Sequence, residues 1–93
     1  MALVFPAKDP QEVLDYTIDW SARIDDNDVI ETSTFTLVSG SGLTLGSQSN
    51  DDTSTTVWLS AGTLGTTYEI LNHIITEDGR EMEQTVKIKI KAK

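Results

Sequence analysis

The chain has 93 residues, which is enough for one domain and leaves no room for a second hydrophobic core. Its 15 acidic and 7 basic residues give a net charge of −8, which disfavours nucleic acid and anionic membranes as partners, because Lys and Arg supply most affinity for phosphate. There is no cysteine, so disulfides, thiolate metal sites and cysteine nucleophiles are excluded.

The first twelve residues carry a short apolar run between polar surroundings. Leu3, Val4 and Phe5 form this run, and Pro6 and Pro10 follow it in a segment that can continue neither a helix nor a central strand. We interpret residues 1–12 as an extended arm that docks on another protein through the apolar run. The alternative is that they form the first edge strand of a domain that otherwise spans residues 13–93.

No run of the sequence approaches the roughly 20 apolar residues of a membrane span. The N-terminal residues also lack the basic and apolar regions of a secretory signal. We therefore expect a protein that is made in the cytoplasm and does not contact a membrane.

Strict alternation of apolar and polar residues from Val13 to Trp20 predicts a half-buried antiparallel strand. A turn and an acidic loop follow, and a β-branched stretch predicts the next strand over Val29 to Val38. Further strands are predicted at 43–45, at 53–59, after Gly65 and at 82–91, with a polar loop over 46–52 and an Asp-Gly turn of type I′ at 77–80.

Six or seven short strands with frequent turn signals, and no amphipathic helix of useful length, indicate an all-β fold. We predict a single immunoglobulin or fibronectin III-like antiparallel β-sandwich. The stretch from Ala61 to Tyr68 resembles the corner that opens the penultimate strand of such domains, where a tyrosine hydroxyl bonds to nearby backbone. The alternating strands predict one shared core, formed by Leu14, Tyr16, Ile18, Trp20, Val86, Ile88 and Ile90.

Two features of the sequence are candidates for binding other proteins. Trp58 alternates with Val57 and Leu59, which leaves open whether it is a core residue or an exposed contact. Charge is uneven as well: up to Gly79 there are two basic and 13 acidic residues, and from there on five basic and two acidic. The basic last strand either pairs with an acidic neighbour in its own sheet or meets the acidic surface of another subunit. The lysines concerned are Lys87, Lys89 and Lys91.

The sequence offers little for catalysis or metal binding. The acidic loops at 25–28 and 51–52 lack the EF-hand pattern, so we interpret them as solvated. His73 is the only histidine and no Gly-x-Ser-x-Gly motif is present. We expect no catalytic, cofactor-binding or metal-binding residues and no enzymatic activity.

Several ordered segments are similar to those of small structural proteins of tailed phages and prophages. They are Lys-Asp-Pro-x-Glu and Asp-Tyr-x-x-Asp-Trp within residues 8–24, Asp-x-Ile-x-x-Ser at 28–33, the tryptophan strand at 57–63, and Tyr-x-x-x-Asn-x-Ile-x-Thr-x-Asp-Gly-Arg at 68–80. One departure is Ala61, where members of the family have glycine. The departure concerns only the geometry of that turn.

The resemblance implies a β-sandwich adaptor in the virion, made in the cytoplasm of a bacterial host. Such an adaptor joins tail, baseplate or neck components to fibres or other virion proteins, and it is repeated in a symmetric assembly. The resemblance implies no enzyme and carries over no catalytic residue. The alternative is a fibronectin III-like module that binds carbohydrate or a cell-surface partner.

Overall fold

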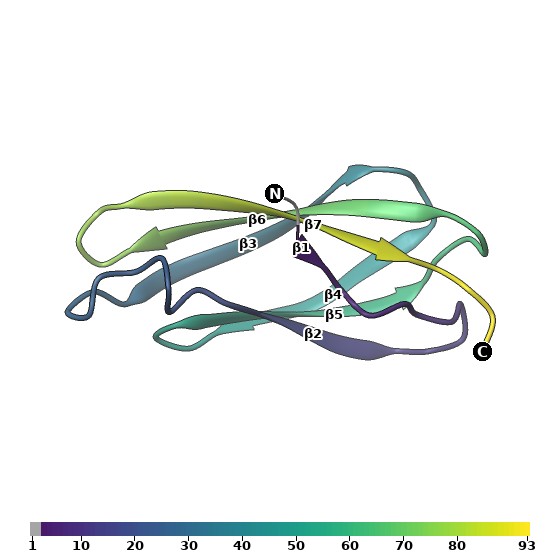
Figure 1. The fold of residues 1–93 in the computed structure, drawn as a ribbon, viewed down its shortest axis with the longest axis horizontal. Helices are drawn as coiled ribbons and strands as arrows, with labels where there is room; N and C mark the ends of the chain where they lie inside the picture. Colours follow the sequence, from purple (N-terminus) through teal and green to yellow (C-terminus); the bar gives the residue numbers. More distant parts are fainter. Residues whose placement is uncertain (1–2) are drawn as a thin grey trace.

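The computed structural model describes residues 3–93 and consists of β-strands joined by turns and loops (Figure 1). No helix occurs within these residues. The seven strands are β1 (Leu3–Val4), β2 (Leu14–Asp19), β3 (Ile30–Ser39), β4 (Leu43–Asn50), β5 (Ser54–Ala61), β6 (Thr67–Thr76) and β7 (Glu81–Lys89).

The strands form two sheets that stack face to face (Figure 1). One sheet has four strands in the order β1-β7-β6-β3, and the other has three in the order β2-β5-β4. All neighbouring strands are antiparallel except β1, which is parallel to β7. The β2–β3, β4–β5 and β6–β7 loops lie at one end of the long axis, and the β3–β4 and β5–β6 loops lie at the other (Figure 1). The predicted β-sandwich is confirmed.

The core fills the space between the two sheets, because each strand turns alternate residues inward. Tyr68, Ile70 and Ile74 of β6 have no exposed surface. The core predicted from the alternating strands is confirmed, with Leu14 partly buried at its margin. The buried apolar residues are Phe5, Tyr16, Ile18, Trp20, Ile24, Ile30, Phe35, Leu43, Val57, Leu59, Tyr68, Ile70, Ile74, Val86, Ile88 and Ile90.

A buried set of polar groups connects the two sheets. The indole N–H of Trp20, directly after β2, donates to Asn72 Oδ1 of β6 at 3.0 Å and to the Thr55 hydroxyl of β5 at 3.2 Å. Thr55 in turn donates to Asn72 at 2.7 Å, and the Asn72 amide N–H donates to Ser33 and to the Thr34 carbonyl of β3. Each buried polar group here has a partner, which removes the penalty of leaving it unpaired.

The tyrosine corner expected from the sequence is present. The Tyr68 hydroxyl accepts a hydrogen bond from the Thr63 N–H at 2.9 Å and donates to the Ser41 carbonyl at 2.6 Å. The second bond ties the β3–β4 loop to the corner. Gly40 is required in this loop, since a Cβ there would lie 2.7 Å from the Tyr68 ring.

Strand β4 is longer than predicted. The sequence places a loop over 46–52, but Gly46 to Asn50 continue the strand after a register shift between Leu45 and Gln48. The polar residues of this half do not reveal a strand because most of them face solvent. Gln48, which lies opposite Val57, is exposed and bonds to both backbone groups of Phe35, at the open edge of β3.

The N-terminal residues pair with the rest of the sandwich. Leu3 and Val4 lie opposite Val86 and Lys87 as a two-residue edge strand. Phe5 is buried, and its ring stacks on Tyr16 with the ring centroids 4.8 Å apart. Leu3 and Val4 are therefore an edge strand of the sandwich, and Met1 and Ala2 lie outside the described part. Whether residues 1–12 also dock on another protein stays a prediction.

The β6–β7 turn differs from the type I′ expectation. A type I′ turn needs positive φ at both central residues. Gly79 has φ of 90°, but Asp78 is not in the positive-φ region. Gly79 N–H donates to the Thr76 carbonyl at 2.9 Å, and Thr76 N–H donates to the Arg80 carbonyl at 2.8 Å. This is a three-residue loop with a type I turn followed by a left-handed glycine.

Replacing Trp20 with alanine should lower the free energy of unfolding by about 3 to 5 kcal/mol, because it empties a buried site and removes one of the two donors to Asn72 Oδ1. Trp58→Ala is the matched control, since Trp58 is 43% exposed. It should change stability by no more than about 0.5 kcal/mol. Urea unfolding of both variants measures the difference, and equal losses would contradict the assignment of Trp20 as the core tryptophan.

Ala61 has a backbone conformation that favours glycine. Its φ is 60°, and Lys8 Nζ holds its carbonyl at 2.6 Å. The left-handed region costs an L-residue about 1 to 2 kcal/mol. Glycine avoids this cost, but its greater conformational entropy in the unfolded chain lowers the free energy of unfolding by about 0.4 to 1 kcal/mol, which offsets part of the gain.

We therefore expect Ala61→Gly to stabilise the fold by about 0.5 to 1 kcal/mol. Ala22→Gly, at an exposed turn position without positive φ, should destabilise it. Thermal unfolding of the two variants tests the sign. A loss of stability in Ala61→Gly would show that the corner is not strained.

Candidate interaction surfaces

The described residues 3–93 contain no pocket and no group of three potential metal ligands. They also contain no helix long and apolar enough to cross a membrane. His73 lies on β6 with its Nε2 3.0 Å from Glu81 Oε1, so its contact is with its own sheet. The residues that the sequence singles out for binding lie on the surface or next to it, and their surroundings are described below.

The Lys-Asp-Pro-x-Glu segment forms a hydrogen-bonded turn. Asp9 N–H donates to Glu12 Oε1 at 2.8 Å, Gln11 N–H donates to Asp9 Oδ1 at 2.8 Å, and Glu12 N–H donates to the Asp9 carbonyl at 3.0 Å. Lys93 joins this turn through its N–H to Asp9 and its Nζ to Glu12, both at 3.0 Å. The backbone N–H of Gln11 is the largest influence on Asp9, whose pKa lies below its ordinary value.

Lys8 begins this segment, and its side chain is buried. Its Nζ donates to the carbonyls of Asp9 and Ala61. Burial lowers the pKa of Lys8, and the nearby carboxylates of Glu12 and Asp9 partly oppose this effect. Lys8 therefore has a structural role at the corner and does not face a partner.

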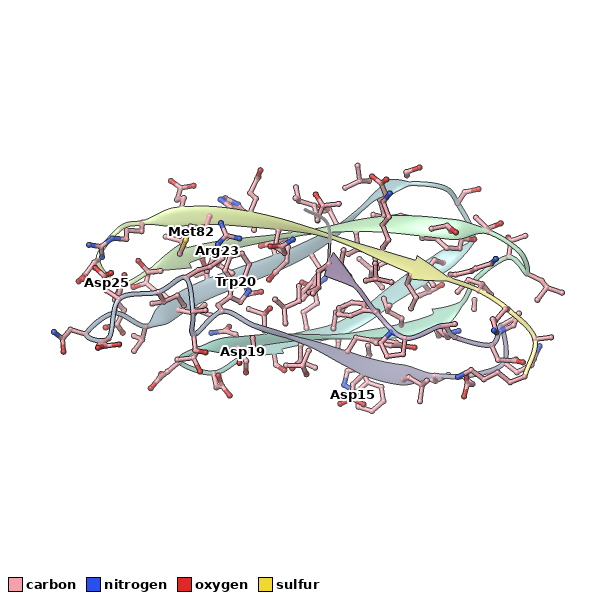
Figure 2. The ribbon with its side chains drawn as sticks, viewed as in Figure 1. Asp15, Asp19, Trp20, Arg23, Asp25 and Met82 are labelled. Atoms are coloured by element: carbon pink, nitrogen blue, oxygen red, sulfur yellow. The ribbon has the colours of Figure 1, made fainter. Side chains whose placement is uncertain are left out.

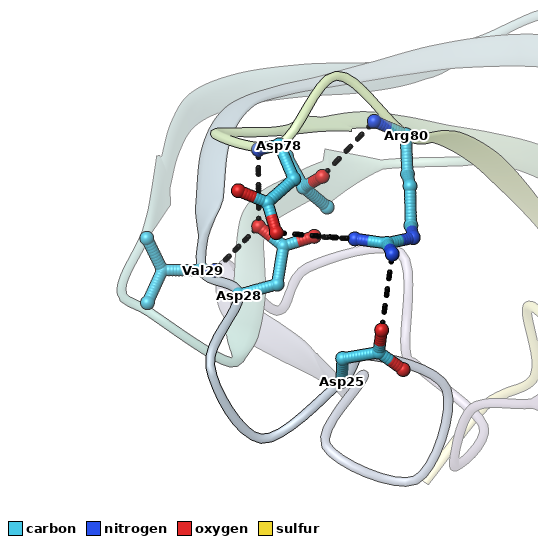
Figure 3. Close-up of polar contacts among 6 residues, drawn as sticks. Asp25, Asp28, Val29, Asp78 and Arg80 are labelled. Atoms are coloured by element: carbon cyan, nitrogen blue, oxygen red, sulfur yellow. Dashed lines mark hydrogen bonds and ion pairs between the residues drawn. The ribbon is translucent and has the colours of Figure 1, made fainter.

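The acidic loop at 25–28 holds an arginine (Figure 3). Arg80, from the β6–β7 turn, contacts Asp25 at 3.1 Å, Asp28 at 3.0 Å and Asp78 at 3.2 Å. The Asp28 side chain is fully buried. The guanidinium compensates the negative charge of these carboxylates, and its contacts join the β2–β3 loop to the β6–β7 turn.

Asp28 also accepts hydrogen bonds from backbone. Val29 N–H and Asp78 N–H donate to its Oδ1 at 2.9 and 3.2 Å. Burial raises the pKa of Asp28, but hydrogen bonds from Thr76, from these two N–H groups and from Arg80 outweigh it. The net pKa lies below its ordinary value of 3.8.

The outer side of the three-stranded sheet carries the exposed tryptophan. Trp58 is 43% exposed on the central strand β5, whereas Val57 and Leu59 on either side of it have no exposed surface. Its register partner on β2 is Asp15, which Figure 2 shows on the outer side of that strand. We call this surface the tryptophan face, and its outward-facing residues are Asp15, Thr17, Asp19, Thr44, Ser49, Ser54, Thr56, Trp58 and Ser60.

The apolar run near the N-terminus is divided by the fold. Leu3 and Val4 are 41% and 67% exposed, whereas Phe5 is 6% exposed and packs on Tyr16. Phe5 was expected at a protein-binding surface, but its ring is part of the core. Only Leu3 and Val4 remain available on the β1 edge.

The candidate lysines lie on the outer side of β7, or directly after it. Lys87 Nζ is 3.8 Å from Glu69 on the neighbouring β6, which matches the first of the two readings for this residue. Lys89 and Lys91 are exposed. Lys87 and Lys89 share the four-stranded sheet with Leu3 and Val4, while Trp58 lies on the other sheet.

Sequence reasoning missed two features of the tryptophan face. Asp15 was read only as the polar half of an alternating strand, although it lies opposite Trp58. Gly46 was placed in a loop, but it lies in β4 close to Trp58. The pairing of β5 with both β2 and β4 brings them together, and no local pattern predicts this pairing.

The fold and its surfaces define an immunoglobulin-like β-sandwich that presents sheet faces and edges. The solution structure of the PKD domain from the KIAA 1837 protein has the same fold, with a TM-score of 0.56 at 19% identity over 99% of this chain and 83% of that chain. Residues 8–89 match the family of the podophage GP4 fiber-tail adaptor protein gp77, and the chain belongs to this family. No match was found among curated proteins.

The lowered pKa of Asp28 predicts a pH dependence of stability. A carboxyl whose pKa is lower in the folded state stabilises the fold above its unfolded pKa, and this contribution is lost as the pH falls through the folded value. The unfolding free energy of the wild type should therefore exceed that of Asp28→Asn at pH 7. The difference should shrink as the pH falls below the ordinary value of 3.8.

Asp26→Asn, in the same loop but at an exposed position, is the matched control. Chemical unfolding at a series of pH values measures all three proteins. A difference between wild type and Asp28→Asn that grows toward low pH would contradict the assigned direction of the pKa shift.

Proposed function

We propose that this chain is a non-catalytic adaptor that joins a fibre to the tail of a phage particle. The observation that carries the proposal is the family match, which covers residues 8–89 and therefore nearly the whole sandwich. A protein of this family acts as a structural adaptor in the virion. We propose the fibre and the tail as the two components that this chain joins.

The arrangement of surfaces supports a bridging role. The tryptophan face lies on one sheet, and the β1 edge with Leu3, Val4 and the β7 lysines lies on the other. Two partners that contact these two surfaces would not compete for the same residues. The two sheets are the two layers of one sandwich, so these surfaces lie on different layers around one core.

We further propose that several copies are repeated around the axis of the particle. Lys89 and Lys91 are exposed, and the chain carries a net charge of −8, so a neighbouring copy offers carboxylates to these lysines. Contacts between exposed charges are screened beyond about 8 to 10 Å at physiological salt. Association between copies should therefore weaken as ionic strength rises.

Disruption of the gene in the phage that encodes this chain tests the adaptor function. We expect particles with filled heads and tails but without fibres, and loss of adsorption to the host. Expression of the wild-type chain from a plasmid should restore the fibres. Electron microscopy of purified particles counts fibres for each tail.

The matched control is plasmid expression of Trp20→Ala, which should fail to restore fibres because the sandwich is destabilised. Particles that retain their fibres without the chain would overturn the proposed function. Particles that lose their tails altogether would place the chain earlier in tail assembly and would also overturn it.

A further inference from the structure

The tryptophan face carries a large apolar side chain that the rest of the sandwich leaves partly exposed. Trp58 points outward from the central strand of its sheet. Its exposed fraction is 43%, whereas Trp20 is 1% exposed and Tyr68 has no exposed surface. Tryptophan is the residue type most enriched among positions that dominate protein interfaces.

The residues around Trp58 leave its ring accessible. On the β4 side, the register between Leu45 and Gln48 shifts, and the residues in the shift are Gly46 and Ser47. A Cβ on Gly46 would lie 3.6 Å from the Cβ of Trp58, so the place beside the tryptophan holds no side chain. Bulges of this kind commonly re-aim side chains next to functional sites.

The charge of the tryptophan face has one sign. Asp15 lies directly across from Trp58, and Asp19 follows on the same side of β2. The remaining outward-facing side chains of β2, β4 and β5 are hydroxyls, and none is lysine or arginine. A surface with carboxylates and an indole but without its own cation is complementary to a positively charged side chain.

An arginine fits this combination better than a lysine. A guanidinium is planar, stacks on an aromatic face and still presents N–H donors to a carboxylate. The same molecule contains such a stack, in which the Arg23 guanidinium lies 4.8 Å from the ring centroid of Trp20 (Figure 2). Arg23 there also donates to the Glu83 carbonyl and to Gln84.

We propose that the tryptophan face binds a virion protein that inserts an arginine side chain between Trp58 and Asp15. The guanidinium stacks on the indole and donates to the carboxylate. The hydroxyl side chains around the pair form the rim of the contact. This inference rests on the proposed adaptor function and names the chemistry of one of its partners.

The test uses the full chain and two probes: particles from the phage that lacks this chain, and fibres purified from the same phage. Affinity of the wild-type chain, Trp58→Ala, Asp15→Asn and Leu64→Ala is measured for both. Leu64 is the matched control, because it is 58% exposed but lies in the β5–β6 loop, outside the tryptophan face. Thermal unfolding of each variant confirms that the fold is intact.

We expect Trp58→Ala to weaken binding to one of the two probes by about thirtyfold, as for an interface hot spot. Asp15→Asn should weaken binding to the same probe and reduce its salt dependence. Leu64→Ala should bind as the wild type does. Treatment of that probe with phenylglyoxal, which modifies arginine, should abolish binding, whereas acetylation of its lysines should not.

Two results would overturn the inference while leaving the adaptor function in place. One is unchanged binding of Trp58→Ala to both probes. The other is binding that depends on Trp58 but survives phenylglyoxal, which would assign the indole to another ligand such as a glycan. Failure of the wild-type chain to bind either probe would instead overturn the adaptor function itself.

Discussion

The structure depends on the hydrogen bonds that join Trp20 to Asn72 and Thr55 between the two sheets. Apolar packing alone lets two sheets slide, because it has no direction. The indole N–H and the amide oxygen fix which residue of β2 faces which residue of β6. The Asn72 amide N–H extends the same set of bonds to β3. These bonds therefore fix the positions of β3, β5 and β6 and of the end of β2 relative to one another.

The sequence predicted the elements that carry an alternating pattern, and it missed those defined by partners far along the chain. Apolar and polar residues alternate over most of β2 and β7, and the inward-facing residues of both strands were predicted correctly. The polar half of β4 was missed because its strand character comes from pairing with β5 and from Gln48 bonding to Phe35. Phe5 was misplaced because an apolar run does not tell which member meets Tyr16. The sequence left open whether Trp58 is buried or exposed, and the structure shows that it is 43% exposed on the outer side of β5. Its role in binding stays a prediction.

Most of the segments that carry the family resemblance build the scaffold. Lys8, Asp9 and Glu12 form a turn at one end, and Asp28 with Arg80 joins the loops at the other. Tyr68 and Asn72 fix the corner and the core. Trp58 differs from these residues, since its side chain is 43% exposed and is not part of the buried core. In this family member, the residues that build the scaffold therefore differ from the exposed residue proposed for binding.

Gln48 has a further consequence for the exposed edges of the sandwich. An open strand edge offers unpaired N–H and C=O groups, and identical chains held side by side can join through such edges into continuous sheets. Here the Gln48 amide occupies both backbone groups of Phe35, and Asn50 occupies the Ile30 carbonyl, so these three groups at the edge of β3 have partners without an additional strand. The irregular register of β4 next to it makes that strand a poor template as well. An edge whose groups already have partners, beside a strand of irregular register, offers less to the backbone of a second chain than an open, regular edge does.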